Sequence, residues 1–313
     1  MTMNKRLDWI DLSKGIAIIL MVAGHTSIPE VLSKWIWSFH MPLFFIISGF
    51  LYNEEKYSDF KKFLVARTRS LLIPYAFFSI VVCLGYTGTE FFKPKELLYG
   101  WSGYALWFVP VLFFSELFFN RLVVWTRNRN AIILPSVLVL SLLGLWLSSC
   151  NYHTVFKIEV VPFAVLFYGF GYCFKDIIKD YHSTMILSMV LLILNFALSQ
   201  FLPKLDMCLN LFGQYPMSLL NAILGTVAII FISKYLCMSK YLKIPVIWCG
   251  QNTLLFMALS QLLNYWLLTA INFLHISRVA ALPLRYLLLF GLIYAFSRFF
   301  NKFCPILVGK YAR

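Results

Sequence analysis

Charged side chains are scarce in this sequence, and their scarcity excludes a soluble globular protein. Only 13% of the 313 residues are Asp, Glu, Lys or Arg, whereas 61% are hydrophobic. A soluble domain has about 25% charged residues with which to cover its water-facing surface. At half that content most of the surface must face lipid, and no stretch is polar enough to form a separate soluble domain. We therefore expect one integral membrane domain over residues 1–313.

Cysteine patterns that would indicate a disulfide framework or a metal site are also missing. The 7 cysteines are scattered, mostly inside apolar runs, and none belongs to a C-x-x-C pair. They are typical of small packing residues. No group of Asp, Glu, His and Cys has metal-ligand spacing, so we expect no metal cofactor. A Gly-rich phosphate loop is missing too, so side chains would have to bind any phosphorylated ligand.

Acidic residues are few, which leaves a formal net charge of +14. Nucleic-acid-binding proteins carry such a charge, but here the basic residues form short clusters between apolar runs, as in the cytoplasmic loops of membrane proteins. We therefore expect membrane lipid, and no nucleic acid, as a partner. The sequence leaves open whether the chains form a homo-oligomer.

Apolar runs of about 20 residues, the length that crosses a membrane as a helix, recur along the chain. They predict an all-α fold, a polytopic bundle of about ten transmembrane helices. The expected helices cover residues 10–29, 35–53, 72–90, 104–125, 131–150, 160–175, 184–202, 216–237, 245–273 and 283–300. The sixth is the shortest, and the ninth is long enough to be bent.

The distribution of Lys and Arg predicts how these helices are oriented. If the N-terminus is inside, the loops assigned to the cytoplasm hold most of the basic residues. The outer side holds Lys34, Lys93, Lys95, Lys157, Lys204, Arg278 and Arg285. Cytoplasmic loops of membrane proteins are enriched in Lys and Arg, and an even number of spans returns the chain to its starting side. We expect both termini in the cytoplasm and the protein in a bacterial inner membrane.

The first helix carries polar groups that a simple membrane anchor does not need, namely Asp11, Lys14 and His25. Such groups are costly inside a membrane and usually mark a functional site. Their spacing places them on one helix face, with Lys14 near the cytoplasmic end and His25 about 16 Å further along the axis. The structural alternative is an interfacial Asp11–Lys14 pair and a packing histidine, and the shared face favours the functional interpretation.

A second histidine should lie at the same depth as His25. His40 and His25 are each a few residues from the outer end of their helices, and the short connection makes these helices antiparallel neighbours. Two imidazoles at one level indicate a general base and a partner that orients it or holds the acceptor. Ser48, beside Gly49, is expected where this second helix bends or approaches a neighbour closely.

Two arginines and a glutamate extend the candidate site towards the cytoplasm. Arg67 and Arg69 lie at the start of the third helix, and with Lys14 they would place three cations around one cavity mouth, suited to a phosphorylated cosubstrate. Anchoring by positive residues on the inner side is the alternative. Glu116, in the cytoplasmic half of the fourth helix, is expected to pair with one of these cations or to stay protonated in an apolar site.

Several motifs resemble those of acyltransferase family 3, and among its members the integral membrane proteins related to fucose 4-O-acetylases. The family shows a basic residue, ten intervening residues and a histidine, which correspond here to Lys14 and His25. Similar stretches are FHMPLFF-x-x-SG at 39–49, LWF-x-P at 106–110, which contains Trp107, VPF…YGFGY at 161–172 and GQNTL at 250–254.

Two departures from the family pattern stand out. The family often has an R-x-x-R pair at the start of the third helix, whereas here Arg67 is followed by Thr68 and then Arg69. Many members also have a histidine about ten residues after the late G-x-N turn, where this chain has Ser260 and Gln261. We therefore expect no third catalytic histidine at that position.

The resemblance implies O-acylation of a cell-surface or lipid-linked glycan, with acetyl-CoA as the donor. His25 is then a general base or a transient acyl carrier, and His40 is its catalytic partner. Lys14, Arg67 and Arg69 would bind the phosphates of coenzyme A. Supporting roles fall to Asp11, Ser48, Trp107 and Glu116. The alternatives are a transporter or flippase of a glycan or lipid precursor, for which we see no inverted repeat, and a non-catalytic scaffold.

Overall fold

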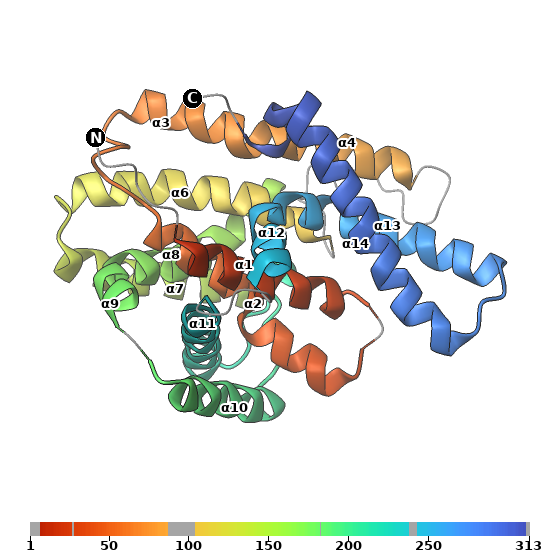
Figure 1. The fold of residues 1–313 in the computed structure, drawn as a ribbon. Helices are drawn as coiled ribbons and strands as arrows, with labels where there is room; N and C mark the ends of the chain where they lie inside the picture. The colour runs from red at the N-terminus through yellow and green to blue at the C-terminus, as the bar shows by residue number, and fades with distance from the viewer. Residues whose placement is uncertain (1–6, 27, 87–103, 182, 238–242, 311–313) are drawn as a thin grey trace.

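The protein is a bundle of helices in the computed structural model, which describes residues 7–26, 28–86, 104–181, 183–237 and 243–310. Within these ranges the chain forms α-helices joined by short turns, and β-structure is limited to one bridge between Asp206 and Leu211. Figure 1 shows the long helices packed side by side in an irregular bundle. The prediction of an all-α fold is confirmed.

The helices follow one another with short connections. The first half contains α1 (Asp8–Gly24), α2 (Glu30–Phe50), α3 (Phe60–Arg67), α4 (Ile73–Gly85), α6 (Phe108–Trp125) and α7 (Asn130–Ser149). The second half contains α8 (Val161–Cys173), α9 (Lys175–Asp180), α10 (Met185–Phe201), α11 (Met217–Leu236), α12 (Lys243–Gln251), α13 (Thr253–Phe273) and α14 (Arg278–Phe303). The shorter turns are η1 (Thr68–Leu72), η2 (Ala105–Trp107), η3 (Val155–Val160), η4 (Met207–Leu209) and η5 (Pro305–Val308).

A helix is present at each of the ten predicted positions, and two of them differ from the prediction in an instructive way. The third begins at Phe60, because Asp59 caps its start by accepting a hydrogen bond from the backbone N–H of Lys62. It then continues through η1, a π-helical turn, into α4. The ninth is divided at Asn252, whose side chain donates to the carbonyl oxygen of Trp248 at 2.8 Å. This break separates α12 from α13.

The outer faces of the bundle are apolar, as expected for a protein in lipid. Among the described residues, eight helical segments are long and apolar enough to cross a membrane. The helices α1 and α10 have 17 residues each. On α7, α10 and α14, the side chains of Val139, Ile186 and Leu287 are 68%, 78% and 71% exposed. Apolar surface of this extent is unfavourable in water. The chain is therefore an integral membrane protein.

The helix α2 lies at the centre and packs against α1, α8, α10 and α11. Its crossing with α8 is close enough that backbones touch. A Cβ atom added to Gly49 would lie 1.8 Å from the carbonyl oxygen of Tyr168, and one added to Gly171 would lie 1.9 Å from that of Ile46. Small residues at such crossings allow transmembrane helices to approach closely. The close helix contact expected beside Ser48 is therefore present.

One end of the bundle gathers the start of α1, the end of α2 and the start of α12. Trp9 packs edge-on against Phe50 with ring centroids 5.2 Å apart, and Lys234 Nζ lies 5.3 Å from the centre of the Trp9 ring. Lys243 Nζ lies 3.5 Å from the Asp8 carboxylate. We call the end that contains these five residues the basic end.

The opposite end gathers the end of α1 and the starts of α2 and α14, and we call it the cavity end. The rings of His25 and Trp37 lie 5.1 Å apart, and the hydroxyls of Thr26 and Tyr286 lie 2.6 Å apart. Lys204, between α10 and α11, is here too, with its Nζ 3.9 Å from the centre of the Trp37 ring. The helix α1 thus starts at the basic end and finishes at the cavity end, and α2 returns to the basic end. Outside the described residues lie Lys5, Arg6, Lys93, Lys95 and positions 87–90 of the third predicted helix.

Candidate active site

A cavity of about 130 Å³ lies at the cavity end, between α1, α2, η2 and the loop before α11. Its lining includes His25, His40, Trp37, Trp107, Met41 and Asp206. Of the residues singled out in the sequence, the two histidines and Trp107 therefore line one cavity. The structure places the two imidazoles together, on neighbouring antiparallel helices.

Each histidine is held by a hydrogen bond to the backbone of its own helix. His25 ends α1, where its Nδ1 lies 2.8 Å from the carbonyl oxygen of Met21. His40 is inside α2, where its Nδ1 lies 2.8 Å from the carbonyl oxygen of Ile36. In both cases the acceptor belongs to the residue four positions earlier, about one helical turn away. The same kind of hydrogen bond therefore orients each imidazole ring relative to its own helix.

These hydrogen bonds fix which ring nitrogen carries the proton. A carbonyl oxygen only accepts hydrogen bonds, so Nδ1 of His25 and of His40 must be the donor. In a neutral imidazole the other nitrogen, Nε2, then keeps its lone pair. Two such nitrogens beside one cavity can accept a proton from a hydroxyl or attack an electrophilic carbon.

Trp37 lies between the two histidines and was not predicted as a site residue. Its ring centroid is 5.1 Å from that of His25 and 5.2 Å from that of His40, and Lys204 covers the ring at 3.9 Å. Contacts of this kind hold both imidazole rings in place. The signal was in the sequence, because residues 37 and 40 are three apart and so share one face of a helix.

The loop between α10 and α11 contributes the carboxylate of the site. The Asp206 side chain accepts from the backbone N–H of Leu209 at 3.2 Å, and its backbone pairs with Leu211. Leu205 and Met207 are buried beside it. Asp206 is the one carboxylate among the described lining residues of the cavity. The sequence predicted only the side of the membrane for this connection, from Lys204, and no site residue in it. Two charged residues, Lys204 and Asp206, in a short and otherwise largely apolar connection were the signal that could have indicated one.

Trp107 is positioned by hydrogen bonds around Gln261. The backbone N–H of Ala105, in the same turn as Trp107, donates to Gln261 Oε1 at 2.7 Å. The Tyr104 hydroxyl donates to that of Tyr86, which donates to the backbone oxygen of Gln261 at 3.4 Å. Gln261 therefore fixes the turn that carries Trp107.

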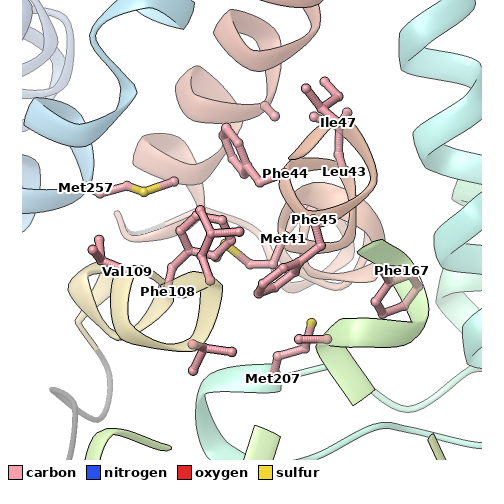
Figure 2. Close-up of a cluster of buried hydrophobic side chains, with 14 of the residues drawn as sticks. Met41, Leu43, Phe44, Phe45, Ile47, Phe108, Val109, Phe167, Met207 and Met257 are labelled. Carbon is pink, nitrogen blue, oxygen red and sulfur yellow. The ribbon is translucent and has the colours of Figure 1, made fainter. Parts of the chain in front are cut away.

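An apolar cluster continues from the cavity into the core (Figure 2). Met41 of α2 lines the cavity, and Phe45, one turn further on, packs against Phe108 of α6 with ring centroids 4.7 Å apart. Met207, from the loop before α11, and Phe167, from α8, belong to the same cluster of buried side chains. All five side chains are buried. The cluster closes the inner side of the cavity to water, which strengthens electrostatic interactions within it.

Comparison with known proteins assigns the chain to a family. The family model described as an acyltransferase domain, that of acyltransferase family 3, matches residues 7–301. The chain belongs to this family. No curated protein and no solved structure matches it. The family match runs from the start of α1 into α14 and so includes every helix that lines the cavity, which makes the cavity the candidate active site of an acyltransferase.

In this acyltransferase the charged pair of α1 lies at the other end of that helix from His25. Lys14 Nζ is 2.8 Å from the Asp11 carboxylate, which also accepts from Gln251 Nε2 at 3.3 Å. The pair and Gln251 join α1 to α12 and leave the Lys14 side chain 22% exposed. Ser48, also singled out in the sequence, donates to the carbonyl oxygen of Phe44 in its own helix at 2.8 Å.

Arg67 and Glu116 form a second and separate ion pair, with 2.9 Å between Arg67 Nε and Glu116 Oε2. Arg67 Nη2 also donates to the Tyr57 hydroxyl at 2.8 Å. Of the partners predicted for Glu116, the structure therefore has Arg67. Arg69 lies in the π-helical turn η1 and is exposed. The sequence predicted that Lys14, Arg67 and Arg69 surround one cavity mouth. In the structure Lys14 and Arg67 belong instead to two separate ion pairs, each with its own carboxylate.

Proposed function

We propose that this acyltransferase transfers an acetyl group from acetyl-CoA to a hydroxyl group of a cell-surface or lipid-linked glycan. One observation carries the proposal: His25 and His40 line one cavity, and each is bound through Nδ1 so that Nε2 keeps its lone pair. The cavity of about 130 Å³ is smaller than the roughly 300–1,000 Å³ of sites that enclose a drug-sized ligand. It suits the acetyl group and the acceptor hydroxyl, with the rest of both substrates outside.

His25 is the proposed general base. Its Nε2 accepts the proton of the acceptor hydroxyl while the hydroxyl oxygen attacks the carbonyl carbon of the thioester. The bond between this carbon and sulfur breaks, and the leaving thiolate takes the proton back from the imidazolium. The products are an O-acetyl ester and the thiol of coenzyme A. A positioned general base contributes about 10²–10⁴-fold to the rate.

The same nitrogen supports a second route through a covalent intermediate. His25 Nε2 attacks the thioester carbon, the thiolate leaves, and the acyl-imidazole carries the acetyl group until the acceptor hydroxyl attacks it. In this route His40 Nε2 takes the hydroxyl proton and releases it to the solvent, from which the thiolate of coenzyme A takes up a proton. Incubation of the protein with labelled acetyl-CoA and no acceptor separates the two routes, because only the second attaches label to the protein.

The walls of the cavity suit a sugar hydroxyl as the acceptor. Trp107 offers a flat apolar ring against which the C–H face of a sugar can pack. Asp206 offers a carboxylate that can accept a hydrogen bond from a neighbouring sugar hydroxyl. Both lie at the cavity end, on the same side as His25.

The proposed orientation places the basic end in the cytoplasm, where coenzyme A is found, and the cavity end at the outer face of a bacterial inner membrane. The greater number of Lys and Arg residues in the loops of the basic end supports this orientation, with both termini inside. The acetyl group then passes along the bundle from a donor bound inside to an acceptor reached from outside.

Inverted membrane vesicles provide the test, because they expose the proposed cytoplasmic end to added donor. With radiolabelled acetyl-CoA and membranes that contain the native acceptor, we expect label in the glycan fraction that depends on the protein. Mild alkali should release this label, since it cleaves O-esters and leaves N-acetyl groups intact. If vesicles with and without the protein gave the same label, the assignment of acetyl-CoA and glycan would be wrong.

A further inference from the structure

A second cavity lies where α12 meets α14, and we call it the α12–α14 cleft. It measures about 540 Å³, within the roughly 300–1,000 Å³ of sites that enclose a small ligand. Its polar lining includes Gln251, Asn252, Ser297, Arg298, Lys302 and Lys310. Gln251 and Asn252 belong to the GQNTL stretch, and the cleft shares no lining residue with the histidine cavity.

The floor of the α12–α14 cleft is a network of hydrogen bonds that holds its elements together. The Ser297 hydroxyl donates to Asn252 Oδ1 at 2.9 Å, and Asn301 Nδ2 donates to the Ser297 carbonyl oxygen at 2.7 Å. Lys310 Nζ donates to Asn301 Oδ1 at 2.7 Å. The junction of α12 and α13, the end of α14 and the chain after η5 are thereby joined at a fixed site.

Three basic side chains converge on this floor. Arg298 and Lys302 are four residues apart on α14 and so share one helix face, and Lys310 reaches the cleft from the residues after η5. All three are exposed. No carboxylate is found among the described residues that line the cleft, and neither Arg298 nor Lys302 pairs with a described carboxylate. Arg298 and Lys302 are thus two cations without a partner carboxylate among the described residues, which favours an anionic ligand.

The cleft adjoins the charged pair of α1. Gln251, which lines it, donates to the carboxylate of Asp11, the partner of Lys14. The helix α14 then leads from the cleft towards the histidine cavity, because Tyr286 contacts Thr26 beside His25 at 2.6 Å. Tyr286 and Ser297 are eleven residues apart, or about 16 Å along the helix. The cleft is therefore near the basic end, about 16 Å below the histidines.

We infer that the α12–α14 cleft binds the phosphate groups of the acyl donor, coenzyme A, and this inference rests on the proposed function. Arginine and lysine are the side chains that bind phosphate, and here they present three positive charges to a donor that carries several negative ones. The flexible arm of the donor then spans the distance to His25. Arg67, bound to Glu116, has no part in this site.

The first test is the affinity of the purified protein for coenzyme A, measured by calorimetry in detergent without added lipid. The variant Arg298→Gln/Lys302→Gln is compared with Arg129→Gln/Lys61→Gln, which removes the same charge from exposed residues elsewhere. Each lost phosphate contact weakens binding about tenfold. We therefore expect up to about a 100-fold increase in Kd for the cleft variant, and little change for the control. For coenzyme A that lacks the 3′-phosphate, the two substitutions in the cleft should raise the Kd by a smaller factor. In transfer assays KM for the donor should rise, with kcat nearly unchanged.

Three results would overturn the inference. Wild-type protein that does not bind coenzyme A is one, and equal affinity of the two double variants is another. The third is loss in the cleft variant of binding to phosphatidylglycerol in nanodiscs while binding of coenzyme A is unchanged, since the cleft would then hold a lipid headgroup. If the cleft variant transfers acetyl groups and binds coenzyme A as tightly as wild type, the inference is wrong but the proposed function stands. If coenzyme A binds through the cleft but the protein transfers no acetyl group, the proposed function is wrong but the inference stands.

Discussion

Arg67 and Glu116 form a charged pair that has little access to solvent. Their side chains are 23% and 5% exposed. Removal of one partner from a buried pair leaves the other charge without compensation and costs about 3–5 kcal/mol. We expect Glu116→Gln and Arg67→Gln each to lower the Tm of the purified protein. The double variant should lose less than the sum of the two, because no unpaired charge remains. Strictly additive losses in thermal melts would mean that the pair does not stabilise the fold.

The two histidines show what the sequence can and cannot predict about single residues. The sequence predicts that His25 and His40 lie at the same depth, because each is a few residues from the outer end of one of two antiparallel helices. The bond of each Nδ1 to a backbone carbonyl, and the place of Trp37 between the rings, depend on side-chain rotamers. Rotamers are chosen by packing among elements far apart in the sequence, so no local pattern of residues determines them.

At the scale of elements, the crossing of α2 and α8 should be sensitive to a single methyl group. A Cβ at position 49 would lie 1.8 Å from the carbonyl oxygen of Tyr168, so Gly49→Ala must push the helices apart. Overpacking of this kind costs about 1–3 kcal/mol. Gly291 is a matched control on α14, since a Cβ there meets no atom within 4 Å. Thermal melting should show a lower Tm for Gly49→Ala and an equal or higher one for Gly291→Ala, because alanine favours helix. Equal melting of both variants would contradict the close crossing.

The helices of this protein could be predicted much better than the segments between them. Apolar runs long enough to cross a membrane fix the positions of the helices, and the late G-x-N turn becomes the break at Asn252. The loop that carries Asp206 and the α12–α14 cleft could not be predicted in the same way. Asp206 reaches the site through backbone pairing with Leu211, and the cleft forms only when the residues after η5 return to α14. Both depend on contacts between distant parts of the chain.

At the scale of the whole molecule, Cys150 reports on the orientation in the membrane. It follows α7 at the cavity end and is exposed, whereas each of the other six cysteines is buried or partly buried. A membrane-impermeant maleimide added to intact cells with a permeable outer envelope should label Cys150, and Cys150→Ser should lose the label. Lys157, assigned to the same side by the sequence, is buried and would be a poor reporter.

A second reporter completes the topology test at the basic end. Arg127 is exposed between α6 and α7, and Arg127→Cys in the Cys150→Ser background should be labelled only in inverted vesicles. The opposite pattern for the two reporters would place the cavity end in the cytoplasm. In that case donor and acceptor would both have to approach the histidines from the inside, and the proposed path along the bundle would be wrong.

The central claim is that the His25 imidazole carries out the transfer, and acetyl transfer in inverted vesicles tests it directly. We compare His25→Asn with His275→Asn, a control at an exposed histidine after α13 whose left-handed backbone (φ 53°) asparagine adopts readily. At equal amounts of protein in the membrane, the account predicts a rate at least about 100-fold lower for His25→Asn and a nearly wild-type rate for the control. A wild-type rate in His25→Asn would contradict it.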